Sequence, residues 1–244
     1  MAIKLEICTG DPEGVLAAIK GGADRVELCS GLAEGGLTPS AAMIRYSAQR
    51  IPTNVLIRPR AGDFVYSPDE LDVMAEDIRI AVENGAQGIV TGALTPEGEV
   101  DVEACRYLLK AAAGLDNTFH RAFDVVANPE RALEEIIELG FARVLTSGQS
   151  SSAEAGAFKI ASLKKQAGKR ISIMAGAGVT PKNIASLVMT SRADEIHASA
   201  RSLRKSELNV SGEAKMGSAD SADGSRMATD PEIVAALRKA IDMI

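Results

Sequence analysis

Short apolar runs alternate with longer segments of helical periodicity along almost the whole chain. The apolar runs are rich in β-branched residues, and we expect strands at residues 3–8, 25–29, 54–58, 88–91, 117–121, 143–146, 171–175 and 195–198. Strands that alternate with helices in this way form parallel sheets with right-handed crossover connections. Eight such units predict an α/β fold of the (β/α)₈ type, a TIM barrel, that occupies residues 1–244 as a single domain.

Proline and glycine mark the expected helix boundaries. A capping side chain stands directly before a proline in Asp11-Pro12, Thr38-Pro39, Ser67-Pro68, Asn128-Pro129, Thr180-Pro181 and Asp230-Pro231. Proline is favoured at the first helical position, and the preceding side chain can accept a hydrogen bond from a free backbone N–H group there. Gly85, Gly114 and Gly140 stand where helices are expected to end.

One segment breaks this rhythm. Residues 203–227 are rich in Ser, Gly, Ala, Asp and Lys and contain few apolar residues. We expect a long loop there, between the last strand and the last helix.

The first two strands carry the same polar pattern. Glu6-Ile7-Cys8 is repeated as Glu27-Leu28-Cys29 one strand–helix unit later. Because side chains alternate faces along a strand, Glu and Cys share one face of each strand and the apolar residue takes the other. The outer face of a barrel strand meets helices, so both Glu–Cys pairs are expected to point into the barrel.

Composition restricts the classes of partner. The formal net charge is −6, the pI is about 5.1 and tryptophan is absent, so no nucleic-acid partner is expected. No apolar stretch approaches the ~20 residues of a membrane span, and no secretory leader pattern is present. The odd number of cysteines favours reduced thiols over disulfides. We therefore expect a cytoplasmic protein without membrane contacts and, for a barrel of this size, a homo-oligomer.

The predicted strand ends carry most of the candidate chemistry, as TIM-barrel sites lie at the carboxyl ends of strands. In Arg58-Pro59-Arg60, two permanently charged guanidinium groups require carboxylates or an anionic ligand. Glu27, in the neighbouring strand, is the expected partner of Arg58. Two interpretations stay open. The residues form an ion pair inside the barrel, or Arg58 and Arg60 bind an anion while Glu27 moves a proton.

Both histidines also fall in the final residues of predicted strands. His120 precedes Arg121 and Asp124, and His197 lies in the eighth strand. Imidazole exchanges protons near neutral pH, so His120 is a candidate for proton transfer. Arg121, Asp124 and His197 are candidate ligand-binding residues. The alternative is that each histidine is neutral and hydrogen-bonded within the barrel. Neither histidine has the spacing of an HExxH zinc site.

A glycine-rich turn follows the seventh strand. Backbone N–H groups at the start of a helix bind phosphate or carboxylate, and the loops after strands seven and eight often form the phosphate site of TIM barrels. Gly176, Gly178 and Arg201 are therefore candidate anion-binding residues. The two glycines fit a tight turn between strand and helix equally well.

Cys8 and Cys29 end neighbouring parallel strands, which run about 4.8 Å apart. Their sulfurs are therefore expected to lie close together. Two thiolates suit soft Cu(I), which makes this pair the candidate metal ligands. The alternative is that both behave as small buried apolar residues. No organic cofactor is expected.

Several longer strings of residues resemble the CutC family. They are EIC at 6–8, GGADRVELCS at 21–30, EGGLTPS at 34–40, IRPRAGDF at 57–64, FHRAFD at 119–124, LTSG at 145–148 and MAGAG at 174–178. The resemblance runs from the first strand to the eighth. It implies a TIM barrel and a role in copper homeostasis, with Cu(I) bound by Cys8 and Cys29. The residues themselves leave a second hypothesis open: an isomerase, lyase or aldolase-like enzyme that acts on a small anionic or polyhydroxylated substrate.

Overall fold

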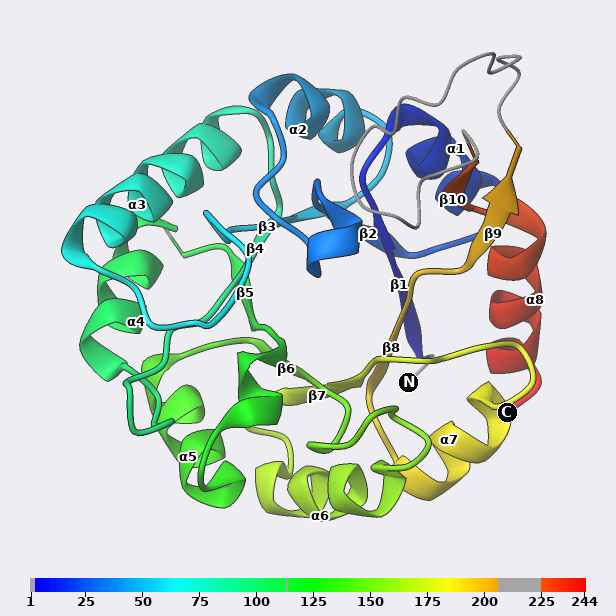
Figure 1. Ribbon diagram of the computed structural model, residues 1–244. Coiled ribbons are helices and arrows are strands. Elements are labelled where there is room, and N and C mark those ends of the chain that lie inside the picture. The colour runs from blue at the N-terminus through cyan, green and yellow to red at the C-terminus, as the bar shows by residue number, and fades with distance from the viewer. Residues whose placement is uncertain (1–2, 113, 206–224) are drawn as a thin grey trace, which may run out of the picture.

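Eight parallel strands close into a ring in chain order. The computed structural model describes residues 3–112, 114–205 and 225–244. The strands of the ring are β1 (Lys4–Thr9), β2 (Arg25–Leu28), β3 (Thr53–Leu56), β4 (Gly88–Thr91), β5 (Asp116–Phe119), β6 (Arg143–Thr146), β7 (Ser172–Ala175) and β8 (Glu195–Ala198). In Figure 1 this ring is surrounded by an outer ring of helices. The predicted TIM barrel is confirmed, and every predicted strand overlaps an observed one.

The outer helices follow the strands one by one. They are α1 (Pro12–Lys20), α2 (Ala41–Ala48), α3 (Pro68–Glu83), α4 (Val102–Ala111), α5 (Pro129–Leu139), α6 (Ala157–Ala167), α7 (Ile184–Ser191) and α8 (Pro231–Asp242), with short 3₁₀ turns η1 (Leu32–Glu34) and η2 (Arg121–Val125). Four of the six predicted cap–proline pairs begin a helix as expected. The Thr38 and Thr180 pairs do not. Ser40 caps α2, because the Thr38 hydroxyl is hydrogen-bonded to the backbone of Arg58. A turn precedes α7, in which the Thr180 N–H donates to Asn183.

The two faces of the strands pack against different partners. Leu5, Ile7 and Leu28 are fully buried in the core between the strands and the helices. Cys8 and Cys29 instead pack inside the ring, with Leu56 and Val90. The expected inward orientation of the cysteines is therefore confirmed, and the alternation of faces along β1 and β2 explains it.

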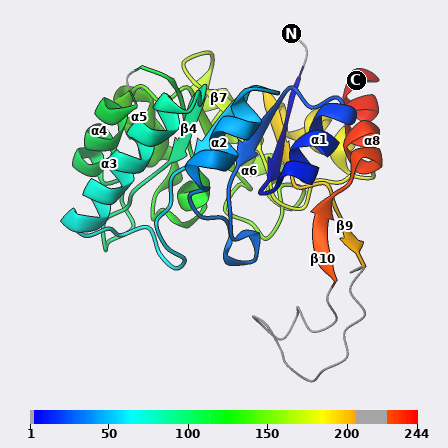
Figure 2. The same cartoon turned by 90° about the horizontal axis from the view of Figure 1, so that it is seen from above.

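The segment between β8 and α8 differs from the predicted loop at its two ends. β9 (Arg201–Arg204) and β10 (Arg226–Thr229) pair antiparallel, and Figure 2 shows them extending from one side of the barrel. Arg226 of this hairpin forms ion pairs with Asp11 and Glu13 at the start of α1. The prediction missed these strands because they are held by backbone pairing and surface charges, with little apolar patterning. The remainder of the predicted loop, residues 206–224, lies outside the described residues.

Among the described residues, none of the helices combines the length and the hydrophobicity that a membrane crossing requires.

Candidate functional site

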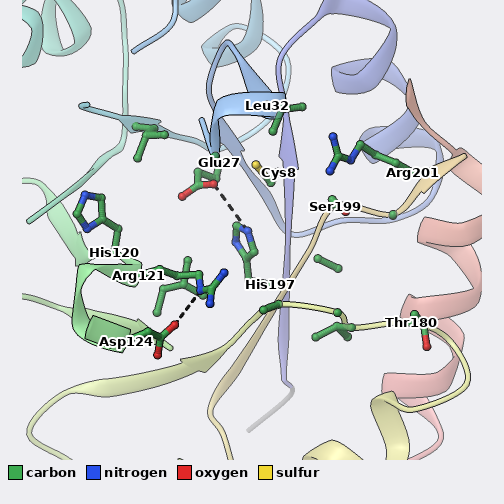
Figure 3. A pocket seen from close by; sticks show the side chains of 18 of the residues that line it. Cys8, Glu27, Leu32, His120, Arg121, Asp124, Thr180, His197, Ser199 and Arg201 are labelled. Atoms are coloured by element: carbon green, nitrogen blue, oxygen red, sulfur yellow. Dashed lines mark hydrogen bonds and ion pairs between the residues drawn. The ribbon is translucent and has the colours of Figure 1, made fainter. Parts of the chain in front are cut away.

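A cavity of about 750 Å³ opens at the carboxyl ends of the barrel strands. Its walls contain most of the side chains that the sequence pointed to: Cys8, Glu27, Arg58, His120, Arg121, Asp124, Gly178, His197 and Arg201. Figure 3 shows several of them around the cavity. Cys29, Arg60 and Gly176 do not line it. Side chains from five strands or strand ends thus converge on one concave surface.

His197 lies at the floor of this cavity, between two glutamates. Its Nδ1 is 2.8 Å from Oε1 of Glu6, and its Nε2 is 3.7 Å from Oε2 of Glu27. The pairing register of β1 with β8 places Glu6 opposite His197, so the short contact follows from the strand alignment. In Figure 3 the Glu27 carboxylate faces the imidazole, with Cys8 close by.

Burial and charge act in opposite directions on this group of residues. Burial raises the pKa of Glu6, but the charge of Arg25 and contacts with His197 outweigh it and lower that pKa to about 2. Burial also raises the pKa of Glu27, and there the charge of His197 only partly offsets the rise. Burial lowers the pKa of His197, but Glu27, Cys8 and Glu6 together raise it well above its usual value. Two carboxylates on one imidazole therefore have very different proton affinities.

An ion-pair network beneath the floor explains why Glu6 stays ionised. Arg25 pairs with both Glu6 and Glu195, and Arg143 lies 3.4 Å from Glu195. All four side chains are at most 8% exposed. This network was not predicted, although Arg25 and Glu195 stand two residues before Glu27 and His197 on the same strand faces.

The two inward cysteines lie side by side, Cys8 in the cavity wall and Cys29 behind it. Their sulfurs are 3.5 Å apart, and the Cys29 thiol donates to the Thr9 carbonyl at 3.6 Å. Cys29 is fully buried, whereas Cys8 reaches the cavity. The hydrogen bond with Cys29 and then burial raise the pKa of the Cys8 thiol well above its usual value. The third cysteine, Cys105, is buried in α4.

Arg58 is not bonded to Glu27, although the sequence predicted that pair. Its Nη1 donates to the carbonyls of Glu34 and Gly36, and its Nη2 donates to the carbonyl of Gly62. The loop segments around η1 and after β3 fold over the guanidinium and bring these carbonyls within reach. The prediction was wrong because it considered carboxylates and overlooked backbone acceptors in the loops.

His120 is a neutral histidine in the cavity wall. Its Nδ1 accepts from the Ala122 N–H at 3.3 Å, so the proton of the neutral ring is on Nε2. Nε2 is buried and has no partner within the described part of the chain. Burial, and then the charge of Arg58, lower the pKa of His120 to about 3. The Phe64 ring packs against the imidazole with 4.8 Å between centroids.

Asp124 fixes Arg121 at the rim of the cavity. The carboxylate accepts from the Thr146 hydroxyl at 2.5 Å and from the Ser147 N–H at 2.9 Å, and from Nε of Arg121 at 2.8 Å. Asp124 is almost fully buried, while Arg121 is about half exposed. The aspartate therefore orients a guanidinium that remains open to the cavity.

The remaining candidates divide into two groups. Arg60 does not line the cavity and pairs with Asp63 and Glu70 in the partly exposed loop and helix after β3, so its ion pairs are not the pairs inside the barrel that the sequence suggested. Gly176 lies under His197, since an added Cβ would be 2.6 Å from Leu145 and 3.2 Å from His197. Gly178, with φ of 68°, lines the cavity, as does Arg201 at the start of β9.

Phe64 and Leu145 are among the wall residues that were not foreseen. Phe64 comes from the irregular loop after β3, for which the sequence carries no clear signal. Leu145 stands two residues after the inward-facing Arg143, so the alternation of faces along β6 predicts its position.

Comparisons with known proteins agree with one another. The model of the CutC family matches residues 3–202. A CutC family protein from Vibrio cholerae is 49% identical over 229 residues, which cover 91% of this chain and 90% of the relative. A CutC family protein from Histophilus somni is 45% identical over 237 residues, which cover 96% of this chain and 98% of the relative.

The comparison with solved structures identifies the same family and the same fold. One match is the crystal structure of a candidate copper homeostasis protein CutC from Streptococcus agalactiae. The two chains are 36% identical, the TM-score is 0.78, and the match covers 82% of this chain and 99% of that chain. An aldolase, with a TM-score of 0.59 and 15% identity, shares the barrel fold alone. The family match over residues 3–202 and the relatives of 45–49% identity lead to one conclusion: this chain belongs to the CutC family.

Proposed function

We propose that this protein is an enzyme that acts on a small anionic substrate in the cavity at the barrel mouth. The observation that carries the proposal is the environment of Arg58. Arg58 is in the cavity wall and only 7% exposed, yet no carboxylate lies within ion-pair distance of its guanidinium among the described residues. The other two buried arginines of the barrel interior, Arg25 and Arg143, are both paired with acids.

A buried charge without a counter-ion is costly, and a bound anion removes that cost. Backbone carbonyls satisfy hydrogen-bonding groups of Arg58 but bring no negative charge. Arg201 adds a second positive charge to the same cavity, and Arg121, although paired with Asp124, adds further guanidinium donors. These charges favour a ligand that carries a carboxylate or phosphate group.

The groups placed for chemistry are Glu27 and His120. Carboxylates and imidazoles are the side chains that most often exchange protons or hydrogen bonds with a reacting group. The neutral His120 carries a buried N–H group that has no acceptor among the described residues, and such a group suits polarisation of a carbonyl oxygen beside a carboxylate. This combination supports an isomerase, lyase or aldolase-like reaction on the anionic substrate.

A ligand screen tests the proposal. We expect at least one member of a panel of sugar phosphates and small carboxylic acids to raise the melting temperature by about 5 °C or more at saturating concentration. The Arg121→Met variant should bind the same compound about 10–100-fold more weakly, since a charge-assisted hydrogen bond is lost. Calorimetric titration measures this change.

Arg60→Met is the matched control. Arg60 also lies after a strand end and pairs with carboxylates, but it stays outside the cavity. Its replacement should leave the affinity unchanged. A panel without a single stabilising compound, or equal losses in Arg60→Met and Arg121→Met, would contradict the proposal.

Binding of Cu(I) is a second candidate function, which the cysteine geometry favours. The 3.5 Å between the sulfurs of Cys8 and Cys29, and their apolar neighbours Leu56 and Val90, suit a soft monovalent ion. The Streptococcus agalactiae relative is also named a copper homeostasis protein. The three thiols are free, which supports a reducing, cytoplasmic setting for either function.

Anaerobic titration with Cu(I) and a competing chelator tests this candidate. The unmodified protein should bind one ion per chain, and Cys29→Ser should weaken binding at least tenfold because one of two soft ligands is removed. Cys105→Ser is the control, as this thiol is buried in α4 away from the pair. Equal Cu(I) uptake by Cys29→Ser and Cys105→Ser would rule the pair out.

A further inference from the structure

We infer that the floor of the cavity binds a divalent transition-metal ion of the zinc class through Cys8, Glu27 and His197. The three possible ligand atoms, Sγ of Cys8, a carboxylate oxygen of Glu27 and a ring nitrogen of His197, all lie within 4.8 Å of one another. They come from the neighbouring strands β1, β2 and β8, which are part of the closed ring.

The spacing is close to that of a tetrahedral zinc site. Metal–ligand bonds of about 2.0–2.3 Å place ligand atoms roughly 3.3–3.6 Å apart. The observed distance between Nε2 of His197 and Oε2 of Glu27 is 3.7 Å. This pair reaches the zinc spacing with a contraction of a few tenths of an ångström, and the Cys8 sulfur, within 4.8 Å of both other ligand atoms, moves toward them by rotation of its side chain.

A second layer of contacts orients the histidine for this role. Nδ1 of His197 is 2.8 Å from the Glu6 carboxylate, and Glu6 is itself held by Arg25 and by Asn54. A histidine that ligates a metal through one nitrogen usually has its other nitrogen bonded to a carboxylate in this way. The Glu6 contact leaves Nε2 as the atom that faces Glu27.

The donor set selects the class of ion. One thiolate and one carboxylate neutralise a dication, and an imidazole completes a mixed S, N, O set that zinc accepts readily. Magnesium and calcium prefer oxygen ligands alone. Three protein ligands leave a fourth position, which here faces the cavity. Open sites of this kind are typical of metal ions that act on substrates.

This inference deepens the proposed function and rests on it for the role of the ion. An ion at the floor would polarise an oxygen of the anion that Arg58 and Arg121 hold. Glu27 would then serve as a metal ligand, and His120 would remain the hydrogen-bond donor of the cavity wall.

Titration of the metal-free, reduced protein with Co²⁺ tests the inference without any substrate. We expect one Co²⁺ per chain with a thiolate charge-transfer absorption and the strong visible bands of tetrahedral Co²⁺, and displacement by one equivalent of Zn²⁺. Cys8→Ser should abolish the charge-transfer band. Glu6→Gln should keep that band but weaken affinity about 10–100-fold, as expected for a residue that positions a ligand.

Cys29→Ser is the matched control, because its sulfur is 3.5 Å from that of Cys8 but is outside the three-ligand cluster. It should retain both the charge-transfer band and the affinity for Co²⁺. The absence of tetrahedral bands in the unmodified protein, or an unchanged charge-transfer band in Cys8→Ser, would overturn the inference. So would loss of the band in Cys29→Ser, since the ion would then lie between the two sulfurs. Circular dichroism confirms that each variant is folded, and Cys8→Ala replaces Cys8→Ser if the latter is not.

The two proposals fail separately. Normal Co²⁺ binding without any stabilising anion contradicts the proposed enzyme and leaves the metal site in place. Stabilisation by an anion in protein that binds no Co²⁺ contradicts the metal site and leaves the anion-binding cavity in place.

Discussion

Replacing Arg25 with methionine is expected to lower the free energy of unfolding by about 3–5 kcal/mol, because removal of one partner leaves buried charges uncompensated. Arg25 is the shared partner of Glu6 and Glu195, and both carboxylates are almost inaccessible to solvent. Methionine preserves much of the volume of the side chain but offers neither carboxylate a hydrogen bond. Urea unfolding at neutral pH measures the loss.

The pH dependence of stability provides a separate readout of the same network. The pKa of Glu6 is lowered from 4.5 to about 2 in the folded protein. A lowered carboxyl pKa contributes stability that is fully present above the unfolded pKa and is lost as the pH falls toward the folded one. The unmodified protein should therefore lose stability between about pH 4.5 and pH 2, and Arg25→Met should lose less in that interval.

Arg170→Met is the control for Arg25→Met. Arg170 pairs with Glu134 on the surface, where both side chains are at least 40% exposed. Exposed pairs contribute about 0–1 kcal/mol. If the Arg25 and Arg170 variants have the same stability, the network beneath the cavity does not stabilise the barrel.

Asp124→Ala is expected to destabilise the protein by about 2–4 kcal/mol, since it leaves several buried donors without an acceptor. The Thr146 hydroxyl and the Ser147 N–H donate to this carboxylate, and both residues are fully buried. The same change releases Arg121 from its orienting contact. The melting temperature should fall, and any anion found in the ligand screen should bind more weakly.

Asp63→Ala is the control for Asp124→Ala, because it also removes a carboxylate that pairs with an arginine. Asp63 accepts hydrogen bonds from Arg60 and from the Val65 N–H, but it is largely exposed. Its removal should change stability by less than about 1 kcal/mol. Equal melting temperatures for the Asp63 and Asp124 variants would contradict the role given to Asp124.

The fold could be predicted because its periodic signals are local. The strand–helix alternation located β1 to β8, and the faces of Glu6-Ile7-Cys8 and Glu27-Leu28-Cys29 identified which side chains turn inward. The polar residues at the predicted strand ends then indicated that the site lies at the barrel mouth, where His120 and His197 are found.

The partners within the site could not be predicted, because they depend on loops and on register. Arg58 bonds to carbonyls in two loops, and no periodic pattern of side chains reveals a backbone acceptor. His197 contacts Glu6 because of the β1–β8 register, which brings together residues 191 positions apart in the chain. The space that His120 occupies beside Gly92 could not be predicted either. An added Cβ there would be 2.9 Å from the His120 ring, so the room for this histidine comes from an absent side chain.

The hairpin of β9 and β10 has a consequence for engineering. Its paired strands bring Arg201 beside Thr229, so the chain departs from the ring and returns to it at one point. The hydrogen-bonded base fixes the distance between these ends, and additional chain length between them adds only a slowly growing entropic cost. A peptide tag or a small guest domain inserted between Arg204 and Arg226 should therefore leave the circular closure of the eight strands intact.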